Sequence, residues 1–306
     1  MKLNVMKLKT LIIALAAIPA LTFAAGRGNG SVVLPAKQSV EAAKAANKLI
    51  LVISQSHEGM AADILANKHT SRFLDTNFIV EEQTHANEQG RYLVYNQQRE
   101  LVHQVAHEPY PYELAVKIKR ALSPETQYYT LLQQFDSGER SEALLEKLVI
   151  GASDAGDREN APRLMRAYID AQASPMAPEA IQLIAKHTTT SNDPGFGMLL
   201  ADISAADDVL GAGKTAEKLA SIIFDEVFAP YINEKNVDVK TLTAKAKSAY
   251  PNNEIAAHID GMAIQFMEMR EDWPGLKSAL PIYLDAHGNQ LTIAAHDYYR
   301  WLNEKS

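Results

Sequence analysis

A short polar segment that could carry chemistry follows directly after a strongly apolar run of the chain, Lys48 to Ser54. The segment comprises Ser56, His57, Glu58, Gly59 and Met60. A loop histidine beside a carboxylate can act as a general base or as a metal ligand. The zinc metallopeptidase pattern needs a second histidine where Ala61 stands, so the pair does not form that motif. The alternative interpretation is that both residues are solvated loop residues.

Histidines are concentrated between residues 57 and 107 of the chain. Five of the nine lie there: His57, His69, His85, His103 and His107. His103 and His107 have the same parity along a predicted strand, so their side chains could point the same way, with His85 in the preceding loop. Imidazole ligands suit copper, nickel and zinc. The pattern predicts a candidate metal site at His85, His103 and His107; the alternative is ordinary surface and edge-strand histidines.

The chain contains no cysteine. This composition excludes disulfides, thiol redox chemistry, thiolate metal sites, iron–sulfur clusters and covalent haem attachment. Gly211 to Thr215 has the ending of a phosphate-binding loop, but Asp208 stands at the position of the first required glycine and no predicted strand precedes it. We interpret this segment as a connection between two helices.

The elements that must position the histidines follow the order α-β-α-β-β-β-α. Lys48 to Ser54 is a continuous, β-branched apolar run, which is typical of a buried central strand. The other predicted elements are a helix at Ser39–Asn47, a helix at Gly59–Asn67, a strand that begins at Phe78, a hairpin formed by Arg91–Asn96 and Glu100–Val105, and an amphipathic helix at Pro111–Leu122.

From Ser123 onward the pattern predicts helices alone. Ser123 and Pro124 resemble a helix start, with a capping residue followed by proline at the first helical position, and Gly138 ends that helix. Further helical periods cover 141–155, 158–171, 178–187, 194–210, 215–231, 239–250, 254–271, 273–287 and 291–302. We expect an irregular bundle or solenoid of antiparallel helices.

The first 24 residues have the pattern of a secretory signal peptide. Lys2, Lys7 and Lys9 precede an apolar stretch that ends before the small-residue site Thr22-Phe23-Ala24. The alternative is an uncleaved anchor, but the apolar stretch is shorter than the roughly 20 residues that span a bilayer. We therefore expect a periplasmic or secreted protein, cleaved after Ala24 or Ala25, with a linker over 25–38.

Charge divides the remaining chain into two parts. Residues 26–122 contain 11 basic and 10 acidic side chains, whereas residues 123–306 contain 16 basic and 27 acidic side chains, a net charge of −11. An acidic surface repels nucleic acid and anionic lipid, so both are excluded as expected partners. The break predicts a domain boundary near Leu122.

The first part resembles the thioredoxin fold, in particular its exported relatives. The resemblance rests on Ala43–Ser54, Ser71–Gln83, the hairpin Arg91–Val105 and the helix after it. The second part resembles the helical C-terminal extension of the same exported proteins, on the segments 135–140, 168–169, 192–198 and 271–289. The resemblance implies an α/β thioredoxin-like domain at 39–122 and an all-helical domain at 123–306.

The chain departs from that family at three places. Neither thiol position in the Ser54–Ala62 slot holds cysteine, and no proline occurs at Ala86–Arg91, where the family has a cis-proline. Only Thr84 to Gly90 separates the second strand from the hairpin, so the second crossover helix is missing. We therefore expect no thiol–disulfide oxidoreductase activity.

These observations predict a non-redox binding or scaffold protein of the cell envelope. The expected partner is an envelope protein of basic character, because the helical part is acidic. The degenerate loop Ser56–Met60 is the candidate binding segment, with no cofactor and no membrane insertion after cleavage. The alternative function is metal binding at His85, His103 and His107, with a copper, nickel or zinc ion.

Overall fold

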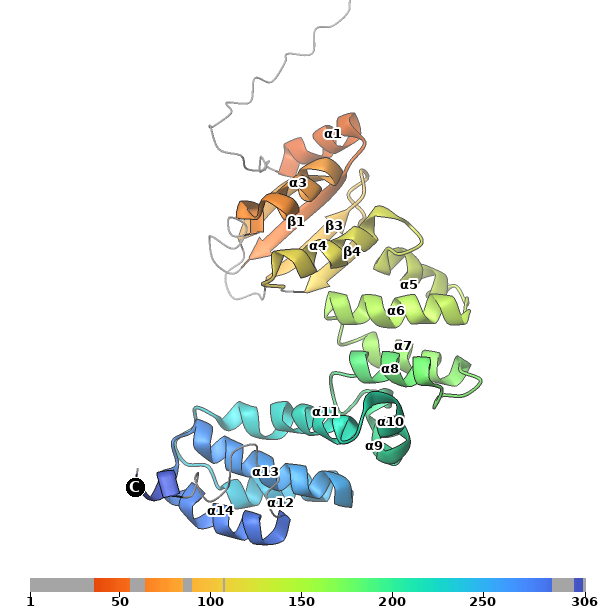
Figure 1. Cartoon of the computed structure of the whole chain (residues 1–306). Coiled ribbons are helices and arrows are strands. Elements are labelled where there is room, and N and C mark those ends of the chain that lie inside the picture. The colour runs from red at the N-terminus through yellow and green to blue at the C-terminus, as the bar shows by residue number, and fades with distance from the viewer. Residues whose placement is uncertain (1–35, 56–63, 85–89, 107, 288–299, 305–306) are drawn as a thin grey trace, which may run out of the picture.

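The structure is a computed structural model that describes residues 36–55, 64–84, 90–106, 108–287 and 300–304. It contains a small four-stranded sheet with its helices, followed by a long row of further helices (Figure 1). This order confirms the predicted change from mixed to helical structure. The first part comprises α1 (Ala36–Ala46), β1 (Leu49–Gln55), α3 (Lys68–Asn77), β2 (Phe78–Thr84), β3 (Arg91–Tyr95), β4 (Leu101–Ala106) and α4 (Pro111–Lys119).

The sheet is mixed, with the strand order β2-β1-β3-β4. β1 pairs in parallel with β2, and β3 runs antiparallel to both β1 and β4. Ile50 therefore faces Ile79 on one side and Tyr95 on the other. A parallel pair needs a crossover connection, and the connection from β1 to β2 contains α3.

The connection from β2 to β3 is too short for a crossover helix. Residues 85–90 are all that lie between these strands. β1 stands between β2 and β3, so the chain must cross two strand spacings, about 10 Å. Six extended residues reach up to about 20 Å, which is ample for this path.

β1 is buried on both faces, as its continuous apolar run predicts. On one face Ile50 and Val52 pack against Ala43 of α1. On the other face, Leu51 and Ile53 belong to a larger cluster that includes residues of α3 and α4. The sheet is therefore the middle layer, with α1 on one face and α3 and α4 on the other (Figure 1).

The second part contains the ten α-helices α5 to α14 and a further helical segment at 300–304, and successive helices pack side by side in a row (Figure 1). One continuous apolar core runs through them from Tyr128 to Leu302. The helices are α5 (Tyr128–Asp136), α6 (Glu142–Ala155), α7 (Ala161–Ala171), α8 (Pro178–His187), α9 (Pro194–Ala201), α10 (Ile203–Leu210), α11 (Lys214–Ile223), α12 (Val239–Ala249), α13 (Asn253–Met269) and α14 (Trp273–His287).

Three predictions in the helical part were wrong at a helix boundary. Residues 123–126 form a turn, closed by the Thr126 hydroxyl donating to the Arg120 carbonyl, so α5 begins only at Tyr128. The predicted helix 194–210 is two helices, because the backbone leaves helical geometry at Asp202. The predicted helix 215–231 ends at Ile223, where a π-helical turn, Phe224–Phe228, follows.

The two parts share an interface along β4, the edge strand, because α5 and α6 pack against it. Gln104 of β4 donates to the Ala155 carbonyl at the end of α6 at 2.8 Å, and its side-chain oxygen accepts from the Tyr129 hydroxyl at 3.2 Å. Arg120 forms an ion pair with Asp154 beside them. The helical part thus covers a strand edge that would otherwise be open to water.

Candidate functional site

Most of the residues singled out in the sequence lie outside the described residues. The candidate binding segment, Ser56 to Met60, follows the end of β1 and lies outside the described residues. His85 and His107 of the predicted metal site also lie outside them. His103 is the one member of the predicted metal set that the structure describes.

His103 lies inside the molecule, where it contributes to the interface between β4 and α5. The side chain is fully buried, and its Nδ1 accepts a hydrogen bond from the backbone amide of Tyr128 at 3.1 Å. Tyr128 is the first residue of α5, whose Gln127 N-cap makes no side-chain capping bond. His103 therefore satisfies one of the amides that a helix start leaves without an intrahelical partner.

The environment of His103 keeps its imidazole neutral. Burial lowers its pKa to about 4, and the charge of Arg120 acts in the same direction. Its Nε2 is buried without a hydrogen-bond partner among the described residues. No group of three or more potential metal ligands occurs in the part of the chain that the structure describes. Metal binding stays a prediction, because two of its three proposed ligands are not described.

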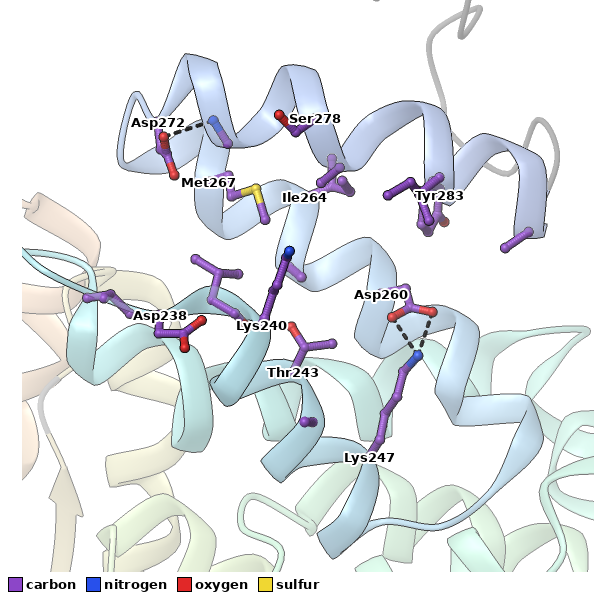
Figure 2. A pocket seen from close by; sticks show the side chains of 18 of the residues that line it. Asp238, Lys240, Thr243, Lys247, Asp260, Ile264, Met267, Asp272, Ser278 and Tyr283 are labelled. Atoms are coloured by element: carbon purple, nitrogen blue, oxygen red, sulfur yellow. Dashed lines mark hydrogen bonds and ion pairs between the residues drawn. The ribbon is translucent and has the colours of Figure 1, made fainter.

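A groove with a volume of about 640 Å³ lies between α12, α13 and α14. Figure 2 shows that α14 forms one wall, α12 forms the facing wall and α13 lies between them. The floor is apolar and consists of Ala263, Ile264 and Met267 of α13. We refer to this feature as the α12–α14 groove.

The α14 wall is smooth, because small side chains recur on the face of the helix that lines the groove. They stand at spacings of three and four residues, which place side chains on one helical face. The lining residues of α14 include Gly275, Ser278, Ala279, Ile282 and Ala286. Ile282 is 70% exposed, an unusual position for so large an apolar side chain beside a hollow.

The start of α14 depends on a tight turn. Glu271 has a positive φ of 56°, and the Asp272 carboxylate accepts a hydrogen bond from the Gly275 amide at 3.0 Å. A Cβ atom at Gly275 would collide with the Asp272 carboxylate, so a side chain there would displace this capping group. Farther along, Tyr283 packs close to the backbone of Gly261, which lets α13 and α14 approach each other. These contacts fix the wall against the floor.

One end of the groove is polar, and its charges are paired. Asp260 of α13 accepts from Lys247 Nζ of α12 at 2.7 Å (Figure 2). The same carboxylate contacts His287 Nε2 of α14 at 2.8 Å. Burial and the nearby Asp260 charge raise the pKa of Tyr283, whose ring lies 5.0 Å from that of His287. One carboxylate therefore joins all three helices that form the groove.

The other end holds one cation that the structure leaves without an ion pair. Asp238 caps α12 by accepting from the Thr241 amide and hydroxyl, so its carboxylate is already used. Lys240 extends from α12 toward the groove (Figure 2), and its one electrostatic effect among the described residues is to assist the Thr241 hydrogen bonds in lowering the pKa of Asp238. The groove thus offers apolar surface, a smooth wall and one lysine, an arrangement suited to binding.

This groove could hardly be predicted from the sequence. The stripe of small residues on α14 is visible as a spacing, but a spacing alone does not say which helix faces it. Met267 of α13 lies in the core, only 8% exposed, and also lines the groove.

Comparisons with protein-family models, with curated proteins and with solved structures gave no match. Among the described residues, no helix combines the length and the apolar character needed to cross a membrane.

Proposed function

We propose that this chain is an exported, non-redox scaffold protein that binds a partner protein of the cell envelope, and that the α12–α14 groove is the binding site. The groove itself is the observation that carries the proposal. Its floor is apolar and buried, an exposed isoleucine lines its wall, and its polar end is internally paired.

The occupant that fits best is an amphipathic helix with basic residues beside its apolar stripe. Helices that bind in grooves insert an apolar face formed by residues at spacings of three, four and seven. Small residues on a receiving helix allow a second helix to approach closely. Basic residues beside the stripe, placed away from Lys240, complement the net charge of −11 on residues 123–306.

The proposal for the sheet part is a thioredoxin-like domain that has lost its redox site. It is supported by the strand order β2-β1-β3-β4, with β3 alone antiparallel to the other three strands. It is also supported by the division of α1 from α3 and α4 across the sheet. The absence of cysteine from the sequence removes thiol exchange from such a domain.

Export is proposed from the N-terminal sequence pattern. We expect the mature protein to begin at Ala25 or Gly26 in the periplasm or an equivalent exported space. N-terminal sequencing of protein from separated cell fractions checks this. An intact Met1 in the membrane pellet would instead support the anchor interpretation.

The binding test uses two short peptides of leucine and lysine, one amphipathic as a helix and the other with the same composition in scrambled order. We expect the amphipathic peptide to bind, as followed by isothermal titration calorimetry. Ile282→Asp should weaken this binding at least about tenfold, because one buried aliphatic side chain contributes about 1.5–3 kcal/mol. If the scrambled peptide bound equally well, the binding would be explained by general charge attraction, and the proposal would be contradicted.

The matched control is Val116→Asp, which changes an apolar residue of α4 that is 45% exposed and lies outside the groove. This variant should bind the amphipathic peptide like the unchanged protein. A photo-crosslinking residue at Ser278 should capture a partner in the native envelope, and Ile282→Asp should abolish the crosslink. A crosslink that persists in the Ile282 variant would place the partner elsewhere.

A further inference from the structure

A second, smaller cavity lies in the middle of the helical row, away from the α12–α14 groove. Its volume is about 210 Å³, many times the roughly 10–15 Å³ that one water molecule needs. Segments of three connections or helix ends meet around it: the turn from α6 to α7, the end of α8 and the start of α9. Its polar lining includes Ser153, Asp157, Arg158, His187, Thr189 and Asp193.

His187, the last residue of α8, presents an unsatisfied imidazole at this cavity. The side chain is only 8% exposed, and its Nδ1 is buried without a hydrogen-bond partner among the described residues. Burial lowers its pKa to about 4, with smaller contributions from the charges of Lys186, Arg120 and Lys218. The ring is therefore neutral at pH 7, and either nitrogen can accept a hydrogen bond.

Asp193 presents a carboxylate that is weakly satisfied for a buried group. It is 3% exposed and caps α9 through a long 3.4 Å bond from the Gly195 amide. Burial raises its pKa to about 6, while the Thr189 amide and the Lys218 charge act in the opposite direction. No ion pair to Asp193 occurs in the described parts of the chain.

Asp157, which lines the same cavity, has a carboxylate whose hydrogen bonds are all made within the protein. It accepts from the Tyr128 hydroxyl at 2.8 Å, from the Asn160 side chain at 2.7 Å and from the Asn160 amide at 3.0 Å. These bonds lower its pKa despite partial burial. Asp157 therefore belongs to the turn between α6 and α7, and Asp193 is left as the carboxylate available to a ligand.

Arg158 supplies a positive charge to the same lining. Its side chain is exposed, and no described carboxylate pairs with it. A carboxylate, a neutral imidazole and an unpaired guanidinium around one cavity suit a small zwitterion. We infer that this cavity binds a free α-amino acid, whose ammonium group donates to Asp193 and His187 Nδ1 and whose carboxylate pairs with Arg158.

This inference is independent of the groove and is tested on the full mature chain. Glycine and alanine are titrated in parallel with methylammonium and acetate, which each carry only one of the two charges. We expect both amino acids to bind at least about tenfold more tightly than either single-charge probe, since each lost charge pair costs on the order of one such factor. No binding of either amino acid, or acetate or methylammonium binding as tightly as glycine, would overturn the inference.

Two substitutions assign the contacts. Asp193→Asn keeps a capping residue at the start of α9, because Asn caps helices as well as Asp does, and it should abolish glycine binding. Asp202→Asn changes the cap of α10, outside the cavity, and should leave the affinity unchanged. Arg158→Gln should weaken glycine but not methylammonium. Glycine binding that survives Asp193→Asn would contradict the assignment.

Nitrogen-15 NMR of the histidines gives a readout that a purely structural role would not move. If the ligand ammonium donates to His187 Nδ1, glycine should fix the tautomer with the proton on Nε2. The His103 signals should stay unchanged in the same titration. An unchanged His187 spectrum at saturating glycine would remove this residue from the site.

Discussion

Individual buried histidines give this protein its clearest acid sensitivity. His103 accepts the Tyr128 amide through Nδ1, which is possible only while that nitrogen carries no proton. Its folded pKa of about 4 lies below the ordinary value of 6.5, so the unfolded chain binds a proton that the folded chain rejects. Stability from this residue is therefore present above pH 6.5 and is lost as pH falls toward 4.

Lowering the pH from 7 to 5 should reduce the unfolding free energy of both the unchanged protein and His103→Gln. We expect the reduction to be about 2 kcal/mol larger for the unchanged protein. Gln keeps an acceptor for the Tyr128 amide but does not titrate. Urea denaturation of both proteins at the two pH values measures this difference. The pKa of His187 is lowered and that of Asp193 is raised, so both residues also change the stability in this pH range. Both are present in the unchanged protein and in the variant, so their contributions cancel when the two proteins are compared. Parallel losses would mean that His103 is accessible to protons.

Redox silence is a second prediction at this scale. Without a thiol the protein should not reduce insulin disulfides. Cysteines introduced at Ser56 and Gly59, or at Gly59 and Ala62, should restore little activity, because the family's proline is also missing at 86–91. Insulin turbidity assays check both double variants. Strong reduction by either one would show that a thioredoxin-like peptide site persists.

At the scale of elements, one buried ion pair ties α1, β2 and the β3–β4 hairpin together. Glu81 of β2 is 1% exposed and receives Arg99 Nη2 at 2.8 Å. The Ser39 hydroxyl of α1 contacts the same carboxylate. Arg99 has a positive φ of 66° in the hairpin turn, so the bond also fixes the turn. Breaking such a pair from one side leaves a buried charge uncompensated.

Arg99→Met should therefore lower the unfolding free energy by about 3–5 kcal/mol, whereas Arg99→Met combined with Glu81→Leu should recover much of that loss. Arg163→Met is the matched control, because its pair with Asp136 is 44% and 54% exposed and should contribute less than about 1 kcal/mol. Urea denaturation compares the three variants. Equal losses for Arg99→Met and Arg163→Met would contradict the burial argument.

The break between α9 and α10 gives a test at a single helix end. The Asp202 side chain accepts from the Ala205 amide at 3.0 Å and so starts α10. Asp202→Ala should cost about 1 kcal/mol, the usual value of an N-cap. Asp202→Asn should cost little, because Asn keeps the acceptor. Thermal denaturation distinguishes the two variants. An equal loss of stability in both would mean that the charge of Asp202 stabilises α10, and that its capping hydrogen bond does not.

Helices with strong local signals were predicted well, and those that depend on distant contacts were not. A proline at the first position and a period of 3.6 predicted α8 at Pro178–His187. The helical period also predicted α14 at Trp273–His287. The apolar period continues across Asp202, so it could not reveal the break there. The cap on α5 comes from His103, 25 residues earlier, and no local pattern contains it. The groove and the cavity are likewise meetings of separate helices.

At the scale of the whole molecule, the helical part covers one of the two edges of the sheet, the edge formed by β4. β4 has one strand neighbour, and α5 and α6 cover its other side. A chain of residues 36–122 alone would expose that edge, which is a template for pairing with another copy. We expect this fragment to associate, as measured by size-exclusion chromatography with light scattering. Gln104→Lys should reduce the association, and a monomeric, folded fragment would contradict the role given to α5 and α6.

The order of the helices in the row has a consequence for how the molecule opens. Each helix packs mainly on neighbours one or two positions away along the chain, and α12 to α14 form the end of the row farthest from the sheet (Figure 1). In such stacks the last units can unfold locally while the rest stays intact. Backbone amides of α12 to α14 should therefore exchange with deuterated water sooner than those of β1. A helix held in the groove would slow exchange there and leave β1 unchanged.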